Sequence, residues 1–270
     1  MKTWVKVLLS CVAAVFAIGG MATVAIFNDW FEKNHVHEFE NHLCGCGEYD
    51  DTVAIVSNGI IYESIIDIVE AAPTDGTEVV ITLYADTTNA AFRVIEGQNI
   101  TIDLNGHKLD VVAPGVGSTG TETLGFQLLK GAKVTFKDGT IAVAEGTTGI
   151  KMLIQNYCDL TLEDVIVDGR NLDTDGQYNY TVSNNCGNVV IKGSTEIYAT
   201  TNRTDNMAFA LDACRYATYT DGVTVTFVDF DGIVSGAVEI SGNAVGKVGE
   251  AKIVAPNGTV LTANGIYYFI

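Results

Sequence analysis

The sequence predicts an all-β fold in which short parallel strands stack coil upon coil. Three observations lead to this expectation. Segments of alternating apolar and polar residues recur after Asp51, and Gly, Asp or Asn closes each of them. One motif repeats at intervals of 26 to 34 residues. A single helical segment followed by many strands excludes a doubly wound sheet.

One amphipathic helix is expected over residues 62–72, where Pro73 prevents continuation. Such a helix would cover the apolar end of the first coil and protect its strand edges. Residues 265–270 form an apolar strand, whose side chains we expect to fold inward on a final coil. The apolar stripe of the helix consists of Ile65, Ile66, Ile68 and Val69. The expected strands are 78–84, 99–104, 133–136, 159–162, 188–191 and 224–227.

Internal repetition is the strongest signal for stacked coils. Four segments that begin at Phe92, Phe126, Met152 and Tyr180 align as one motif, and their starts are 34, 26 and 28 residues apart. A period of this size with two strand pieces per repeat is typical of a solenoid, in which each coil pairs with the next about 4.8 Å above it. A β-sandwich with evenly spaced strands is the alternative.

Asparagine and cysteine each recur at an interval of 28 residues, which predicts that their side chains stack in columns. Asn156 and Asn184 lie 28 residues apart, and Asp212 follows after another 28. We expect the two asparagines to form an amide ladder at a turn. The same interval separates three cysteines, which we expect to form an inward column of small apolar groups. These cysteines are Cys158, Cys186 and Cys214.

Residues 7–27 predict export of the chain. The segment holds 21 residues without a charge, long enough to span a bilayer. Lys2 and Lys6 precede it, which orients the amino end toward the cytoplasm and the remainder outward. A cleaved secretory signal peptide is the alternative. Both interpretations place the domain outside the cell or on its surface, and it is membrane-anchored if the segment is not cleaved.

Residues 28–50 form a linker rich in His and Cys, with a possible structural zinc site. In an extended chain, residues two apart point to the same side, so His35 with His37 and Cys44 with Cys46 each offer two donors. Two imidazoles and two thiolates make a tetrahedral set suited to Zn²⁺. The C-x-C spacing is tighter than the usual zinc spacing, and a flexible stalk with an oxidisable cysteine pair is the alternative.

Composition limits the classes of function. The net charge of −18 excludes nucleic-acid binding, because a phosphate partner needs a basic face. The apolar content of 47% predicts a folded core, and six cysteines are too few for a disulfide scaffold. The predicted organisation is a signal peptide or membrane anchor over 1–27, the linker over 28–50 and one domain over 51–270.

Residues 54–109 resemble the first coils of domains in bacterial cell-surface proteins of the pectate-lyase-like superfamily. The resemblance rests on a first strand, a helix, the strand 76–86 ending in Asp, and the segment Ile100-Thr-Ile-Asp-Leu-Asn-Gly-His-Lys-Leu109. It implies a right-handed, single-stranded parallel β-helix with an N-terminal capping helix, in an extracellular setting. The family includes polysaccharide lyases, hydrolases and members without evident activity.

Weak candidates for catalysis lie in one loop, at Asp168, Arg170, Asp173 and Asp175. Carboxylates with a nearby cation could serve a polysaccharide lyase or glycoside hydrolase. The pair Asp173 and Asp175 could also hold Ca²⁺, although the later glutamate of a full calcium loop is missing. Acid-rich loops of an acidic protein are more often solvated turns. The motifs of the galacturonan hydrolases in this superfamily are absent from the sequence.

Three functional hypotheses follow. The favoured one is a non-catalytic exported module that binds a glycan or a surface protein along its long face. The others are a small polysaccharide-cleaving enzyme and a structural envelope component without a ligand. Convergence of the acids at 168, 173, 175 and 205 on a cation would favour the enzyme. Clustering of exposed aromatic residues would favour the binding module, and the residues to watch are Tyr178, Tyr180, Tyr216 and Tyr219.

Overall fold

The computed structural model divides the chain into two units, Met1–Thr52 and Val53–Ile270. In the first, β1 (Phe39–Glu40) and β2 (Leu43–Cys44) pair antiparallel. No helix among the described residues has the length and apolar character needed to cross a bilayer, and the predicted segment 7–27 lies outside them. The structure describes residues 38–50, 52–176, 178–203, 205, 207–215, 222–244 and 249–269.

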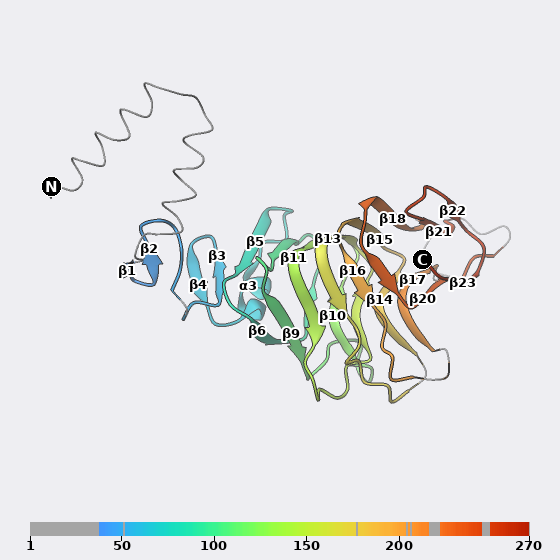
Figure 1. Ribbon diagram of the computed structural model, residues 1–270, viewed down its shortest axis with the longest axis horizontal. Helices are drawn as coiled ribbons and strands as arrows, with labels where there is room; N and C mark the ends of the chain where they lie inside the picture. Colours follow the sequence, from blue (N-terminus) through green and yellow to red (C-terminus); the bar gives the residue numbers. More distant parts are fainter. Residues whose placement is uncertain are drawn as a thin grey trace, which may run out of the picture. The chain divides into compact units, whose positions relative to one another are not determined.

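The regular structure of the second unit consists mainly of strands in two mostly parallel sheets, which confirms the all-β prediction (Figure 1). The seven-stranded sheet contains, in spatial order, β23 (Gly265–Tyr267), β20 (Ala237–Ser241), β17 (Ala208–Cys214), β14 (Asn179–Asn185), β12 (Met152–Asn156), β10 (Leu124–Leu128) and β7 (Phe92–Val94).

The fourteen-stranded sheet runs beside it and has one main path with four additional strands. The main path is β22 (Val260–Leu261), β21 (Ala251–Val254), β18 (Val223–Phe230), β15 (Asn188–Gly193), β13 (Asp159–Asp168), β11 (Lys133–Val143), β8 (Asn99–Asp103), β5 (Glu78–Leu83), β3 (Ile55–Ser57) and β4 (Ile60–Tyr62). The additional strands are β6 (Thr87–Ala90), β9 (Lys108–Val112), β16 (Glu196–Tyr198) and β19 (Ile233–Ser235).

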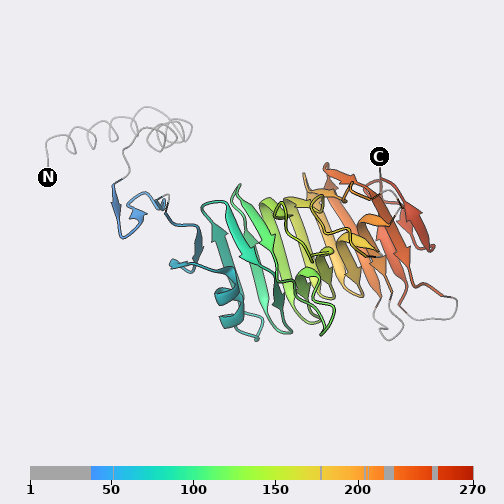
Figure 2. The same cartoon turned by 90° about the horizontal axis from the view of Figure 1, so that it is seen from below.

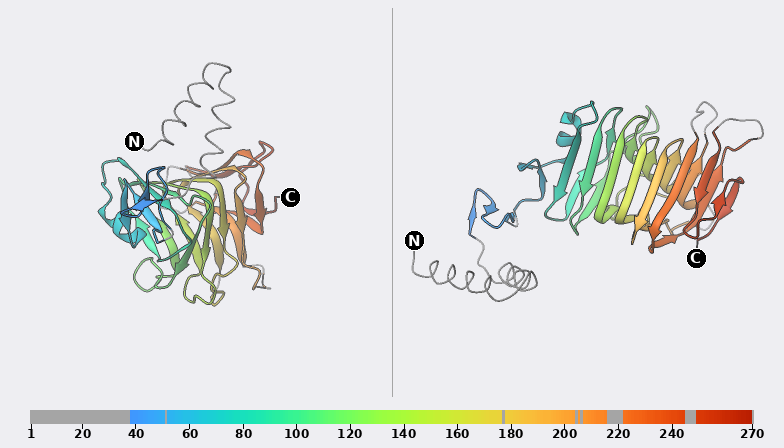
Figure 3. Two further views of the ribbon diagram at one scale, coloured as in Figure 1. Left: turned by 60° about the vertical axis from the view of Figure 1, so that its left-hand side comes forward. Right: turned by 90° about the horizontal axis from the view of Figure 1, so that it is seen from above.

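The chain visits the two sheets alternately. Each strand of the seven-stranded sheet from β7 to β20 is followed in the sequence by a strand of the fourteen-stranded sheet. These strands of the seven-stranded sheet are β7, β10, β12, β14, β17 and β20. Each strand pairs in parallel with its counterpart from the next repeat, as Met152 does with Tyr180. The strands therefore succeed one another along the unit in sequence order, as Figures 2 and 3 show.

The fourteen-stranded sheet bends at one column of residues with left-handed backbone. Because β11 and β13 continue through this bend, they extend beyond the predicted ends at 136 and 162. Asn, Asp and Gly are the residues that adopt positive φ most readily, and only such residues occupy the column. They are Asn105, Asp138, Asp164, Gly193 and Asp229, with φ between 46° and 58°. These turn-forming residues therefore bend the sheet where the sequence pattern predicted strand ends.

Side chains that alternate inward along both sheets fill the space between them. Val, Ile and Leu dominate, and a row of aromatic rings lies near the first repeats, where Phe126 is 4.8 Å from Phe92 and 5.2 Å from Phe136 between ring centroids. Both Phe126 and Phe136 are fully buried. Burial of apolar surface in this continuous core is the main driving force that holds successive repeats together.

The predicted helix is confirmed but is shorter, and α3 spans Ile65–Ala71. Ser64 caps its amino end, and Asn89 accepts hydrogen bonds there from the backbone N–H of Ile65 and the hydroxyl of Ser64. At the other end, Gln98 Nε2 donates to the Val69 carbonyl at 2.6 Å. Residues 60–62 belong to β4, whose pairing with β3 replaces the first predicted turn. The helix lies at the first-strand end of the stack (Figure 2).

The predicted asparagine ladder is confirmed. Asn156 Nδ2 donates to Asn184 Oδ1 at 2.9 Å, and both side chains are completely buried. Asn184 in turn donates to the carbonyls of Gly187 at 3.0 Å and Thr224 at 3.2 Å. The amides thus bond backbone carbonyls at the corner between the two sheets.

We expect Asn184→Ala to lower the free energy of unfolding by about 3 kcal/mol, because it removes three hydrogen bonds of a completely buried side chain. The change is measured by urea unfolding. Asn188→Ala is the matched control, since the Asn188 side chain is exposed and bonds only Asp159. A loss of equal size in both variants would contradict the ladder's structural role.

The predicted cysteine column is wrong. Asp159 pairs with Asn188, so Cys158 occupies the position of Gly187 rather than that of Cys186. Cys214 pairs with Asn185. Asn156 pairs with Asn184 and Asp159 with Asn188, so two residues separate the first pair of positions and three the second. We assign the extra residue to Cys186, which has a φ of 65°. The three cysteines lie at or just after the ends of strands of one sheet, but the equal sequence interval does not put them in register.

The motif alignment also fails at one step. In the seven-stranded sheet Phe126 pairs with Ile154, two residues beyond the predicted partner Met152. The other sheet keeps the predicted 26-residue offset, with Val134 opposite Leu160. The turn between β12 and β13 is two residues shorter than the turn between β10 and β11, which accounts for both observations. A change in turn length shifts the register of one strand of a repeat without shifting that of the other.

The carboxyl end of the stack differs in part from the expectation. Strands β22 and β23 pair antiparallel with β21 and β20, and so end both sheets. Phe269 folds inward and lies 5.4 Å from Phe227 between ring centroids. Ile266 and Tyr268, however, are exposed. Short antiparallel edge strands discourage the addition of foreign strands.

Candidate functional site

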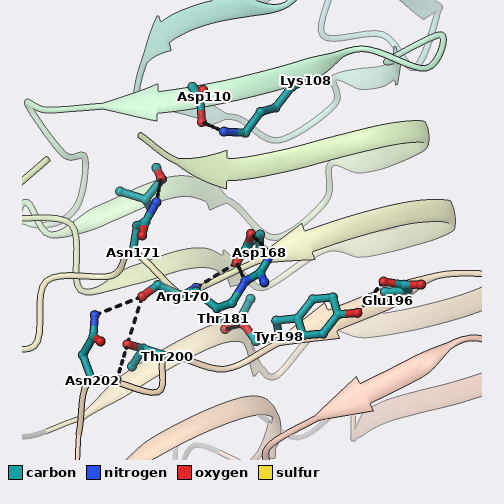
Figure 4. Close-up of polar contacts among 11 residues, drawn as sticks. Lys108, Asp110, Asp168, Arg170, Asn171, Thr181, Glu196, Tyr198, Thr200 and Asn202 are labelled. Atoms are coloured by element: carbon teal, nitrogen blue, oxygen red, sulfur yellow. Dashed lines mark hydrogen bonds and ion pairs between the residues drawn. The ribbon is translucent and has the colours of Figure 1, made fainter. Parts of the chain in front are cut away.

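The sequence-predicted loop begins with a closed ion pair between Asp168 and Arg170. The Arg170 guanidinium donates to both carboxylate oxygens, from Nε at 2.8 Å and from NH2 at 2.6 Å (Figure 4). The Arg170 backbone N–H adds a third bond at 3.0 Å. Burial opposes ionisation of Asp168, but these bonds outweigh it and hold its pKa below the ordinary value. Three local hydrogen bonds therefore hold the Asp168 carboxylate in place.

A tyrosine and a glutamate extend this pair across the sheet. Asp168 pairs with Tyr198 on β16, and the Arg170 guanidinium lies 4.8 Å from the centre of the Tyr198 ring. The Tyr198 hydroxyl donates to Glu196 at 2.6 Å. Figure 4 shows these side chains on one outer surface. Cation–π and charge-assisted contacts of this kind fix the Arg170 side chain in place.

A second ion pair lies two strands away. Lys108 Nζ is 2.8 Å from Asp110 Oδ1, an atom that is shielded from solvent and accepts no well-aligned hydrogen bond. Asp110 and Asp168 both pair with Ala142, on its two sides, so their backbones are about 10 Å apart. Figure 4 shows the two ion pairs as separate groups. They do not combine into one acid–base centre.

The remaining predicted acids stabilise turns. Asp173 accepts hydrogen bonds from the backbone N–H groups of Gly149 at 2.6 Å and Asp175 at 2.9 Å, and both bonds lower its pKa. Asp205 accepts two bonds from Arg203, which lower its pKa to about 2. Each carboxylate thus has its own local partner.

Asp168 is bonded to Arg170 and Asp205 to Arg203, whereas Asp173 is bonded to backbone N–H groups. These contacts bring no two of the three acids to one cation. A general acid needs a raised pKa, whereas the pKa values of Asp168, Asp173 and Asp205 are all lowered. Cations do meet acids on adjacent strands at Lys137 with Asp103 and at Lys192 with Glu163. These pairs lie in other parts of the fourteen-stranded sheet. The geometry around the predicted loop is that of structural ion pairs.

A different group of residues stands out on the seven-stranded sheet. The Tyr180 ring stacks on Phe209 at a centroid distance of 4.9 Å and an interplanar angle of 14°, and Tyr178 follows at 6.3 Å. Phe209 is 3% exposed, although it lies outside the main core cluster, and Tyr178 is exposed. The three rings therefore form a short aromatic ladder on the sheet's outer surface.

Two carboxylates adjoin this ladder. Asp212 on β17 pairs directly with Glu239 on β20, and the Tyr180 hydroxyl donates to Glu239 Oε2 at 3.0 Å. Asp212 is 3% exposed and accepts bonds from the Asn184 backbone N–H at 2.5 Å and the Ser183 hydroxyl at 3.3 Å. We call Tyr178, Tyr180, Phe209, Asp212 and Glu239 the carboxylate–aromatic cluster.

One carboxyl group of this cluster, that of Asp212, has a strongly raised pKa. Burial, reinforced by the charge of Glu239, raises the pKa of Asp212 to about 7 against the opposing bond from Asn184. Burial and the neighbouring charges of Asp212 and Glu239 also raise the pKa of Tyr180. Strongly perturbed groups of this kind concentrate at functional sites, and structural networks produce them as well.

A row of polar residues continues the cluster along the sheet, one residue per strand. Neighbouring members pair in register, and the Gln127 amide donates to Gln155 at 3.2 Å. The polar row consists of Arg93, Gln127, Gln155, Ser183, Asp212 and Glu239.

Sequence reasoning named Tyr178 and Tyr180 but missed Asp212 and Glu239 as a pair. The sequence drew attention to Asp212 only through its interval of 28 residues from Asn184. The offset between β14 and β17 is one residue longer, which places Asp212 opposite Ser183 on the outer surface. Tyr216 and Tyr219 lie outside the described residues. No sequence signal revealed the one-residue shift.

The predicted zinc ligands are described only in part. Cys44 is buried and Cys46 is exposed, and the Cys46 backbone N–H lies 3.5 Å from Cys44 Sγ. His35 and His37 lie outside the described residues. Within residues 38–269, apart from the gaps given above, no three His, Cys, Asp or Glu side chains gather as a metal site.

Comparison of the chain with known proteins finds no matching protein family, no matching curated protein and no matching solved structure.

Proposed function

We propose that residues 53–270 form a right-handed parallel β-helix of the pectate-lyase-like kind. The alternation of the chain between two sheets supports this proposal, as does the pairing of each strand with its counterpart in the next repeat. The handedness follows the strong preference of parallel crossover connections for a right-handed path. Helix α3 would serve as the cap of the first coil.

We further propose that the domain is a non-catalytic surface module that binds a glycan through the carboxylate–aromatic cluster. The single observation that carries this proposal is the aromatic ladder beside the polar row. Aromatic rings offer flat apolar surfaces to the C–H faces of sugars, while a few polar groups fix the ligand's orientation. Carboxylate and amide oxygens accept hydrogen bonds from sugar hydroxyls.

The charge of the protein narrows the class of glycan. With a net charge of −18 and two acids in the cluster, the surface repels polyanions such as polyuronates. Neutral and amino sugars are the expected ligands. Export through residues 7–27, membrane anchoring and a zinc-braced linker at His35, His37, Cys44 and Cys46 fit the same role and stay predictions, as does a calcium ion near Asp173.

The proposed function predicts that Tyr178→Ala weakens glycan binding about fivefold, because one stacked aromatic contact contributes about 1 kcal/mol. Binding of neutral, amino and acidic oligosaccharides to the full-length protein is measured by isothermal titration calorimetry. Ile60→Ala is the control, since Ile60 is exposed on β4, a strand of the other sheet. The proposal is wrong if no oligosaccharide binds, or if both variants bind like the wild type.

A further inference from the structure

Asp212 and Glu239 form a pair of acids beneath a tyrosine. They are direct partners on neighbouring parallel strands, where equivalent positions are about 4.8 Å apart. Tyr180 reaches from β14 across β17 to Glu239, with its ring flat on Phe209. Asp212 is thereby cut off from solvent, whereas Glu239 is only partly buried.

Among the described residues, the groups shown to contact this pair carry no positive charge. From β14, Tyr180, Ser183 and the Asn184 backbone approach, and from β17 Cys214 lies nearby. On β23, the Tyr267 hydroxyl donates elsewhere, to Ala263. Neither acid takes part in an ion pair within the described part of the chain. Two adjacent carboxylates in such surroundings cannot both ionise without strong repulsion.

We propose that Asp212 and Glu239 share one proton near neutral pH, and that its loss releases Tyr180 from Phe209. With the proton present, Glu239 stays in place and accepts the bond from the Tyr180 hydroxyl. When the second carboxyl ionises, Glu239 moves toward water because it is the more exposed member. Tyr180 then loses its acceptor, and the ring no longer covers Phe209.

This switch would regulate the binding surface, a consequence that rests on the proposed glycan function. The stacked rings of Tyr180 and Phe209 form the ladder that Tyr178 continues. Release of Tyr180 breaks the ladder in its middle. Ligand binding is therefore expected to weaken as the pH rises through neutrality. The raised pKa of Asp212 agrees with the proton lying on the buried member of the pair.

The switch is tested without any ligand by carbon-13 NMR of the full-length protein between pH 4 and 9. The carboxyl signals of Asp212 and Glu239 and the ring signals of Tyr180 are followed. We expect one carboxyl proton to be lost near neutral pH, with the Tyr180 ring signals shifting at the same midpoint. Glu239→Gln should abolish this shared midpoint while keeping the fold, because Glu239 is partly exposed. Asp110→Asn, on the other sheet, should leave it unchanged.

Two results would overturn the switch. One is ionisation of both carboxyls below about pH 5, as in unperturbed acids, and the other is a Tyr180 signal that does not respond to the titration. Calorimetry with the same oligosaccharides at pH 5.5 and pH 8 tests the regulatory consequence. Binding that is several-fold weaker at pH 8 supports it, and equal binding contradicts it. Absence of binding at both values contradicts the glycan function, while the NMR titration still decides the switch.

Discussion

Gly97→Ala is expected to destabilise the protein by at least about 4 kcal/mol. Gly97 lies at a turn with a φ of +84°, which costs a residue with a side chain about 1–2 kcal/mol. A Cβ at this position would also overlap the backbone carbonyl of Thr74. Backbone atoms cannot move aside as a flexible side chain would, so the strain must displace a neighbouring turn.

The turns around Gly97 are stacked and hydrogen-bonded to each other. The Gly76 N–H donates to the Gly97 carbonyl at 2.8 Å, and the Gly97 N–H donates to the Gly131 carbonyl at 3.0 Å. Gly146→Ala is the matched control, since Gly146 has a φ of +78° but open space around it. Urea unfolding should give about 1–2 kcal/mol for the control. Equal losses in both variants would contradict the close stacking of these turns.

Asp212 is expected to make stability depend on pH. Its pKa is about 7 in the folded protein and about 3.9 when unfolded, so the folded state binds more protons between these values. The contribution of Asp212 to stability is therefore full below pH 4 and is lost as the pH rises through 7. The loss amounts to roughly 4 kcal/mol.

Asp212→Asn should remove this dependence, because an amide accepts the Asn184 bond without ionising. Relative to the wild type, the variant should gain stability between pH 5 and pH 8, measured by urea unfolding at each pH. Asp159→Asn provides the control, since Asp159 is exposed on the other sheet. A constant difference between Asp212→Asn and the wild type across this range would show that Asp212 is already ionised in the folded state.

The sequence predicted the architecture well where a repeat depends on strand spacing. Alternating segments located β5, β8, β11, β13, β15 and β18, and the apolar stripe before Pro73 located α3. These signals work because burial on one face requires a regular pattern. The amide pair of Asn156 and Asn184 was also predictable, since the turn lengths between them preserve the register.

Register failed wherever a turn changed length by one or two residues. An equal interval of 28 suggested a cysteine column, yet the extra residue Cys186 puts Cys158 opposite Gly187. The interval between two residues is the sum of the lengths of the strands and turns between them. A longer turn and a shorter one can therefore leave this interval unchanged while the strands pair in a different register. The same effect concealed the pairing of Asp212 with Glu239.

The candidate site was less predictable than the fold. Acid density drew attention to Asp168 and its loop, but Asp168 there bonds Arg170 and Asp173 bonds backbone N–H groups. The carboxylate–aromatic cluster is assembled from three strands that are distant in sequence, at Tyr180, Asp212 and Glu239. The pairing of neighbouring strands brings these residues together, and a short sequence motif cannot predict such a pairing.

The central claim is that successive repeats stack in register along one axis. Electron–electron distance measurements between pairs of spin labels test it directly, with one label at position 78 and the second at 159, 188 or 252, in a background without the native cysteines. These positions belong to one exposed column and lie three, four and six strands from Glu78. Backbone separations of about 14, 19 and 29 Å, increasing linearly with strand number, are predicted. Distances that do not increase in this order, as in a β-sandwich, would contradict the account.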